Sequence, residues 1–498
     1  MKKAFQIGFI LVVFLLILFP FVLMPFFHND TNSEKRELSS MPSIINSEGS
    51  FNVNFMSEFG NYFEEHFAFR TELIAFNNSL NRTLLTSGSD SVIVGNDGWL
   101  FYSGSKNDYE RKDQLSDRAL QNIAHNLSLL QRYCESQGSK FVFVCPPNKN
   151  ELYSNKMPYY YIKGEGESNW KRLVQYLDEY NVNYVDLYSL LKSDSETLYL
   201  KTDSHWNTKG AYLATNAILE NLQIESGNTS VNLVSASNLT GDLESLINPL
   251  NPTKEEDFYI QGINDGEGFK GTSWSFKNGT AVEDSTVETN SEGKSAYGSL
   301  LMYRDSFANA LIPLFSSKFN YAYYSKLVPY NTLLIQDQKP GVVVVERAQR
   351  HLSYLAEVAP IMSSTLVEKS LETKEEKNLD VGLKCSKNGP FTILQGTVPK
   401  SYQSSDVKIY MSIIKADGTS QTYEAFNCSQ NLPESFVDSD GSSQQSTTLN
   451  GGIETDYGFT FYFDSEALGD KNCEFSLCVE NGNQASCIKT FEYSSLNF

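Results

Sequence analysis

The stretch FVFVCPP at residues 141–147 is an apolar run that two prolines bring to an end. Such a run is typical of a strand that is buried on both faces of a sheet. The residues before it, 116–138, carry apolar side chains three and four positions apart, which predicts a helix. A second predicted helix, residues 169–180, leads to another strand at residues 184–187. Strand, helix and strand in this order predict a parallel α/β sheet.

Three later apolar segments, 300–303, 321–324 and 342–345, supply the other predicted strands of this sheet. The residues in between, about 223–297, are rich in Gly, Ser, Asn, Thr and acidic residues and have few apolar runs. We therefore expect a long insertion rather than sheet there, with a lid or a binding loop as its role. The α/β domain as a whole is predicted to span residues 91–373.

The last part of the chain has a different pattern. A charged stretch at residues 374–377 is predicted to be a linker, and short segments of alternating apolar and polar residues follow it. These segments predict a small β-sandwich at residues 378–498, which we expect to be an independent module. Within it, Cys478 and Cys487 would face each other across a two-residue hairpin turn at residues 482–483, and they could then form a disulfide.

The N-terminus begins with Lys2 and Lys3, which precede an apolar run that extends to about residue 27. Its length suffices to cross a hydrocarbon layer of roughly 30 Å as a helix, and the charge asymmetry places the lysines in the cytoplasm. The sequence thus predicts a single-pass membrane anchor at residues 1–27 and an extracytoplasmic remainder. Residues 28–90 are expected to form a tether and an amphipathic segment that packs on the next domain. A cleaved signal peptide is the alternative.

The charge and the cysteines exclude some functions. The formal net charge of −20 argues against a nucleic-acid partner, which would need clustered Lys and Arg. The seven cysteines form neither a Cys-x-x-Cys motif nor a cluster with histidine, so we expect no metal site. No cofactor is expected either.

Two polar motifs stand where parallel sheets collect reactive groups, after a predicted strand or in the loop before a helix. Ser306 follows the strand 300–303 and opens a helix, so its hydroxyl is expected at a sharp turn near the positive end of that helix. His205 is the best candidate for a base, because His125 falls off the apolar face of its helix. Asp203 can orient that imidazole. Taken singly, each motif also suits an ordinary helix cap.

Five short segments resemble a known family and occur in the family's order. They read FEEHFAFR (63–70), VGNDGWLFY (94–102), PPNK (146–149), TDSHW (202–206) and DSF (305–307). Through them, about residues 50–355 resemble the alginate O-acetyltransferase-like and DHHW families. The resemblance implies an SGNH-hydrolase-like, flavodoxin-like domain that modifies an extracytoplasmic polysaccharide. It also implies a partner, a multi-spanning membrane acyltransferase that exports the acetyl group.

The same resemblance implies a nucleophile, Ser306, a base, His205, and an orienting carboxylate, Asp203. Ordinary SGNH enzymes carry the serine first and the Asp-His pair last, whereas here the serine comes last. We therefore predict a circularly permuted domain. Its first to fifth strands would be, in that order, residues 300–303, 321–324, 342–345, 141–144 and 184–187.

The substrate contacts are less defined. No Gly-x-Asn-Asp follows the strand 342–345, where Glu346 and Arg347 stand instead, so the second oxyanion donor is open. The candidate substrate-binding residues are Arg347, Lys149, Asn148 and Trp206. Lys149 and Asn148 equally suit a solvated turn after two prolines, and Trp206 equally suits a core position.

The predicted function is an O-acetyltransferase that modifies a cell-surface polysaccharide through an acyl-serine at Ser306. A carbohydrate esterase with the same triad is one alternative, because transfer and hydrolysis share the acyl-serine and differ only in the acceptor. A non-catalytic glycan-binding scaffold is the other alternative, in which the acidic surface, the long insertion and the β-sandwich do the work.

Overall fold

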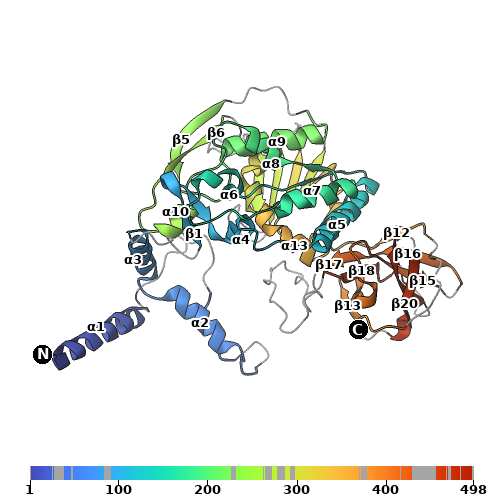
Figure 1. Cartoon of the computed structure of the whole chain (residues 1–498), viewed down its shortest axis with the longest axis horizontal. Coiled ribbons are helices and arrows are strands. Elements are labelled where there is room, and N and C mark those ends of the chain that lie inside the picture. The colour runs from blue at the N-terminus through green and yellow to red at the C-terminus, as the bar shows by residue number, and fades with distance from the viewer. Residues whose placement is uncertain are drawn as a thin grey trace.

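The computed structural model places an α/β domain beside a C-terminal β-sandwich, and helices α1 and α2 extend away from both (Figure 1). The α/β domain lies between these helices and the sandwich along the chain. The residues that the structure describes are 2–24, 26, 39–45, 49–83, 91–225, 232–261, 263, 272–276, 286–291, 298–369, 371, 378–415, 417–428, 456–466, 468, 473–482 and 484–495.

A seven-stranded sheet forms the centre of the α/β domain. Five of its strands are parallel, and two antiparallel strands extend it at one edge. Counted from the strand before Ser306, the parallel strands lie in the order 2-1-3-4-5, which is the flavodoxin-like arrangement and the predicted permuted order. Across the sheet the strands are β4 (Tyr184–Val185), β3 (Lys140–Val144), β11 (Val342–Glu346), β9 (Ser299–Tyr303), β10 (Tyr321–Ser325), β8 (Thr286–Ser291) and β7 (Thr272–Phe276).

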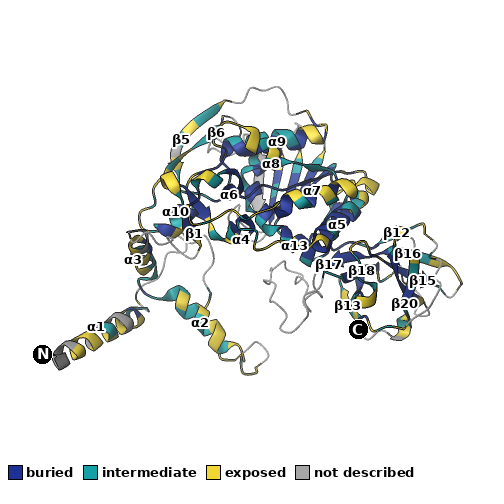
Figure 2. Cartoon of the chain, in the orientation of Figure 1, coloured by how far each residue is buried: buried dark blue, intermediate teal, exposed yellow. Residues whose placement is uncertain are grey.

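The central strands alternate their side chains between two apolar cores. Val142 and Val144 of β3 face one core, whereas Phe141 and Phe143 face the other, because successive residues of a strand point to opposite faces. Helices cover both faces, and the strands are accordingly buried (Figure 2). The first core is covered by α8 (Leu187–Ser193), α9 (Thr208–Asn221) and α11 (Ile312–Ser316), and the second by α5 (Asp117–Ser136), α7 (Asn169–Glu179) and α13 (Leu352–Glu357).

The helices predicted at residues 116–138 and 169–180 are confirmed. Helix α5 begins after Ser116, whose side chain accepts a hydrogen bond from the Ala119 amide, and Gly138 follows its end with a φ of 81°. Helix α9 is capped by Asn207, whose side chain accepts a hydrogen bond from the Gly210 amide. A hairpin pairs β1 (Val92–Val94) with β2 (Leu100–Tyr102).

The expectation of an insertion without sheet at residues 223–297 is wrong. This segment supplies β7 and β8 of the central sheet, the pair β5 (Leu233–Leu239) and β6 (Glu255–Ile260), and helix α10 (Asp242–Ile247). Strand β8, which lies between β10 and the edge strand β7, escaped notice because most of its buried positions carry hydroxyls, two of which bond to Ser316 of α11. Thr289 Oγ1 donates to Ser316 Oγ at 2.8 Å, and Ser291 Oγ donates to the Ser316 carbonyl at 2.9 Å. A search for apolar runs does not detect such a strand.

The C-terminal part is a two-sheet β-sandwich, as predicted, but it begins earlier than residue 378. Its first strand precedes the predicted linker at residues 374–377, which lies outside the described residues. One sheet contains β12 (Thr365–Val367), β16 (Ser420–Glu424), β15 (Lys408–Ile414), β19 (Glu474–Asn481) and β20 (Gln484–Glu492), and the other β13 (Lys384–Asn388), β14 (Phe391–Thr397), β18 (Gly458–Asp464) and β17 (Phe426–Cys428).

The sandwich shares a core with the α/β domain, so the expectation of an independent module is wrong. Phe426 and Tyr462 belong to the same apolar core as helix α5. His125, which the sequence placed off the apolar face of that helix, is buried, and its Nε2 lies 3.0 Å from Glu424 Oε1 of the sandwich. The next residue, Asn126, donates to the Asn427 carbonyl at 2.7 Å. The polar face of α5 is therefore an interface.

Three helices precede the α/β domain: α1 (Lys2–Leu23), α2 (Phe55–His66) and α3 (Arg70–Thr83). The amphipathic α2 buries none of its residues, so the expectation that it packs on the next domain is wrong. Helix α3 makes that contact instead, because Asn78 Nδ2 donates to the carbonyls of Leu246 and Ile247 in α10. Among the described residues no helix has the length and apolarity that a membrane crossing requires, so the structure does not support the predicted anchor.

Candidate active site

Ser306 lies at the carboxyl end of β9, where the chain turns from strand to helix. Asp305 caps this turn, because its Oδ1 accepts the Phe307 amide at 2.9 Å. The first turn, Ser306–Ala310, is a 3₁₀ turn rather than the predicted α-helix, and α11 follows it. The strand order reverses between β9 and β11, so Ser306 stands at the switch point of the sheet, where open α/β folds bind ligands.

The loop before α9 brings His205 and Asp203 to the serine, as predicted. His205 Nε2 lies 2.9 Å from Ser306 Oγ, and His205 Nδ1 lies 2.7 Å from Asp203 Oδ1. The carboxylate can accept only from a protonated Nδ1, which leaves the Nε2 lone pair free for the serine hydroxyl. The three side chains thus form the hydrogen-bonded chain that a nucleophilic serine requires.

Asp203 is held as a carboxylate. Burial alone would raise the pKa of Asp203, but the hydrogen bond and the charge of His205 hold this pKa well below its usual range. Backbone amides contribute as well, since Asp203 Oδ1 accepts the His205 amide at 2.9 Å and Oδ2 accepts the Asp242 amide at 2.9 Å. An ionised Asp203 fixes the tautomer of His205 and stabilises the imidazolium that forms during proton transfer.

Trp206 belongs to the core rather than to a pocket wall. Its side chain is buried, and Nε1 donates to the Phe307 carbonyl at 3.0 Å. The ring of Phe307 packs edge-on against both Trp206 and His205, with centroid distances of 5.2 and 4.8 Å. Trp206 thereby holds the serine turn and the histidine loop together.

Lys149 is also buried and ties three loops to one another. Its Nζ donates to the carbonyls of Leu100, Lys201 and Asp203 at 2.7, 2.8 and 2.9 Å. Burial lowers the pKa of Lys149 to about 7, although the charge of Asp203 opposes this shift. Three carbonyl acceptors match the three N–H donors of an ammonium group, so this site favours the charged form. The side chain fixes the backbone of the Asp203 loop.

Asn148 and Arg347 are likewise enclosed. Asn148 Nδ2 donates to Asp108 Oδ2 at 2.7 Å. Arg347 Nε donates to the Tyr330 hydroxyl at 3.2 Å, and its charge is one of those that lower the pKa of Asp305. None of the four predicted substrate-binding residues offers an exposed side chain. Their direct contact with a substrate stays a prediction.

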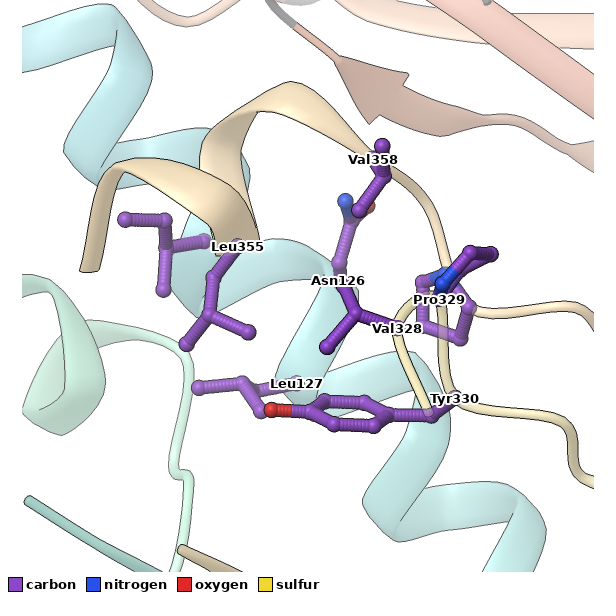
Figure 3. Close-up of a pocket in the computed structure, with 9 residues that line it drawn as sticks. Asn126, Leu127, Val328, Pro329, Tyr330, Leu355 and Val358 are labelled. Atoms are coloured by element: carbon purple, nitrogen blue, oxygen red, sulfur yellow. The ribbon is translucent and has the colours of Figure 1, made fainter. Parts of the chain in front are cut away.

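A small apolar hollow lies between α5, α13 and the loop of residues 328–330 (Figure 3). The ring of Tyr330 runs along it, and Leu127 and Leu355 face it. It contains no residue of the Ser306 site, so we assign no role in catalysis to it.

The loop after β11 contributes residues that the sequence did not single out. Arg350 places its guanidinium 5.0 Å from the ring centroid of Phe307 and 5.4 Å from that of Tyr102. Its Nε is buried without a hydrogen-bond partner among the described residues. The next residue, His351, lies with Nδ1 3.0 Å from Asp305 Oδ2. Because β11 lies beside β9 in the predicted sheet, the sequence could have predicted that the loop after β11 lies near Ser306.

Asp242 was missed as well, and no local signal marks it. This residue begins α10, and its Oδ2 lies 3.5 Å from His205 Nδ1. Asp203, His205 and Asp242 could together face one cation. Because Nδ1 already donates to Asp203, we assign the cluster to proton transfer instead.

The strand order and the chain from Ser306 through His205 to Asp203 define an SGNH hydrolase-like domain. Residues 92–256 match the family described as "SGNH hydrolase-like domain, acetyltransferase AlgX". A curated relative, "Probable alginate O-acetylase AlgJ" of Pseudomonas aeruginosa, is 27% identical over 190 residues, which cover 36% of this chain and 46% of the relative. The chain thus spans less than half the length of that relative. These matches confirm the resemblance to alginate O-acetyltransferase-like proteins.

Three solved structures are also similar to this chain. PatB1 of Bacillus cereus is 18% identical with a TM-score of 0.40, and covers 52% of this chain and 96% of its own. The O-acetyltransferase domain of Pseudomonas putida AlgJ is 18% identical with a TM-score of 0.34, and covers 53% and 92%. A DHHW family protein from Eubacterium siraeum is 17% identical with a TM-score of 0.35, and covers 46% and 85%.

Proposed function

We propose that the chain is an O-acetyltransferase that acetylates a polysaccharide through an acyl-serine at Ser306. The observation that carries this proposal is the continuous hydrogen-bonded chain at 2.9 Å from Ser306 to His205 and 2.7 Å from His205 to Asp203. The similarity to alginate O-acetyltransferase-like proteins supports acetyl transfer to a polysaccharide as the reaction class.

In the first half-reaction, Ser306 Oγ attacks the acyl carbon of the acetyl donor while its proton moves to His205 Nε2. The bond between the acyl carbon and the leaving group breaks, and His205 returns the proton to that group. In the second half, His205 removes a proton from a sugar hydroxyl, whose oxygen attacks the acetyl-serine. Ser306 then regains its proton from His205. Asp203 stabilises the imidazolium in both halves.

Arg350 is the side chain that we assign to the oxyanion of these tetrahedral intermediates. Its charge lies over Phe307, the residue next to the nucleophile, and its buried Nε has no other partner among the described residues. A charged donor that is fixed between two rings before the reaction needs little reorganisation when negative charge develops. This assignment fills the position that the sequence left open after β11.

The esterase alternative uses the same first half and differs in the second, because water replaces the sugar hydroxyl. The scaffold alternative predicts no chemistry at Ser306. Both alternatives are decided by incubating the full-length chain in detergent micelles with an activated acetyl ester and an oligosaccharide, and then measuring the masses of protein and sugar. Acetylated sugar supports transfer, and acetate release alone supports the esterase. If the wild type and Ser306→Ala give the same protein and sugar masses, and both still bind the sugar, the result supports the scaffold alternative.

The remaining parts of the proposal concern location and partner. We propose an extracytoplasmic site because Lys2 and Lys3 precede an apolar run, a pattern that a secretory signal peptide also has. Such a site has no acetyl donor of its own, so a multi-spanning membrane acyltransferase is proposed to deliver the acetyl group. Protease added to intact spheroplasts should degrade the bulk of the protein. Full protection would contradict this location.

A further inference from the structure

Helix α10 packs against the loop that carries His205, the proposed base. The Glu244 amide donates to the Thr202 carbonyl at 3.0 Å. Gly241, the residue before the helix, lies so close to this loop that a Cβ there would meet the Thr202 carbonyl oxygen at 2.2 Å. Backbone is in contact with backbone, and only glycine allows this approach. The segment expected to be a separate insertion is therefore built into the site.

Asp242 contacts both of the residues that precede His205. Its Oδ1 accepts the Ser204 amide at 2.7 Å, and its Oδ2 accepts the Ser204 hydroxyl at 2.6 Å. Its own amide donates to Asp203 Oδ2 at 2.9 Å. One residue thus fixes Ser204 with both carboxylate oxygens and Asp203 with its backbone. Such partners set the orientation of a catalytic side chain.

The carboxylate of Asp242 also acts on His205 through its charge. Asp242 Oδ2 lies 3.5 Å from His205 Nδ1, whereas Asp203 Oδ1 lies at 2.7 Å and takes the hydrogen bond. Two carboxylates therefore face one imidazole. Burial first, and the charge of Asp203 second, raise the pKa of Asp242. The titration of Asp242 therefore depends on the charge of Asp203.

We propose that Asp242 is a positioning residue of the active site, which orients the Ser204–His205 turn and supplies a second negative charge opposite the imidazolium. The proposal rests on the proposed acyl-serine chemistry. The other charged groups around the loop contact atoms other than Nδ1. They are Lys149 on the Asp203 carbonyl, Glu255 on the amides of Lys201 and Thr202, and Arg350 over Phe307.

The test compares Asp242→Asn with the wild type, using full-length protein in detergent micelles. Asparagine keeps the shape and the backbone amide but removes the charge. We expect kcat/KM for acylation by an activated acetyl ester to fall roughly tenfold or more, because the loop loses a fixed partner. We also expect the acid limb of the pH profile to move about one unit to lower pH, because the imidazolium loses a nearby negative charge.

Two control variants separate charge from structure. Ser204→Ala removes the hydrogen bond from the Ser204 hydroxyl to Asp242 but keeps the charge of Asp242. The acylation rate should therefore fall, while the acid limb of the pH profile stays in place. Asp257→Asn removes a nearby carboxylate that binds Thr208 at the start of α9, so it should leave the limb unmoved. The proposal would be overturned if the acid limb of the pH profile did not move in Asp242→Asn, or if it moved equally far in Asp257→Asn.

A second readout does not depend on activity. The ring signals of His205, assigned with a His205→Gln variant, are titrated by NMR in the wild type and in Asp242→Asn. A lower titration midpoint in Asp242→Asn supports the proposed role of Asp242. If no ester is turned over in the same experiments, only the proposed acyl-serine reaction is contradicted. An unchanged midpoint contradicts the role of Asp242 even if the enzyme is active.

Discussion

The contact between His125 and Glu424 provides a test of how the sandwich and the α/β domain are joined. Glu424 is buried at this interface, where its two oxygens lie 3.0 Å from His125 Nε2 and 3.2 Å from Arg132. Burial would raise the pKa of Glu424, but the hydrogen bond and charge of His125, with the charge of Arg132, lower it from 4.5 to about 2. We consider the variant Glu424→Gln, which keeps the shape and loses the charge.

The pKa shift of Glu424 sets the size of its contribution to the free energy of unfolding. A carboxyl group whose pKa falls from 4.5 to about 2 on folding contributes at most roughly 3 kcal/mol to the free energy of unfolding. Because the folded pKa is the lower one, this contribution is fully present above about pH 4.5 and is lost as the pH falls through about 2. Glu424→Gln should therefore lower the unfolding free energy by about 2–3 kcal/mol at pH 7. The difference should shrink below about pH 4.5.

Tryptophan fluorescence is the informative probe, because all four tryptophans precede the sandwich, at positions 99, 170, 206 and 274. If the two parts share one core, a substitution in the sandwich must shift the urea transition that these tryptophans report. The matched control is Glu474→Gln, at an exposed glutamate of the same sheet, which should cost less than about 0.5 kcal/mol. An unchanged tryptophan transition in Glu424→Gln would refute the shared core and restore the independent module.

Two further predictions concern Arg350 and the cysteine pair. Arg350→Met should lower kcat for serine acylation by roughly 100- to 1000-fold with little change in KM, measured with an activated acetyl ester, because an oxyanion donor acts in the transition state; a change in KM alone would contradict that role. Cys478 and Cys487 are partners in the β19–β20 register and are not joined by a disulfide in the structure, so we expect an oxidising compartment to join them. Peptide mapping without reductant should find the cross-linked pair, and two free thiols would contradict the prediction.

The sequence predicted the candidate catalytic residues because they follow strong local signals. Ser306 comes directly after an apolar strand, and Asp203 lies two residues from His205 in the loop before a capped helix. Resemblance to a family then joined the two motifs across about 100 residues. Four of the five parallel strands were evident as continuous apolar runs, and their permuted order followed from the family resemblance.

The failures have a common cause, which is a contact made by polar residues that are distant in sequence. Asp242 lies in a polar segment, and its contact with Ser204 appears only after folding. Strand β8 carries hydroxyls such as that of Thr289 at most of its buried positions. His125 looked exposed because the apolar face of α5 was the only face considered, whereas the sandwich covers the polar face. Local periodicity carries no information about such contacts.

The central claim is that Ser306 carries the acetyl group during turnover. The most direct measurement is to quench the full-length protein in acid within seconds of mixing it with an activated acetyl ester, and to map the modified peptide by mass spectrometry. We predict one added acetyl group on Ser306 in the wild type and none in Ser306→Ala or His205→Ala. An acetyl group on another residue, or equal labelling of wild type and Ser306→Ala, would contradict the account.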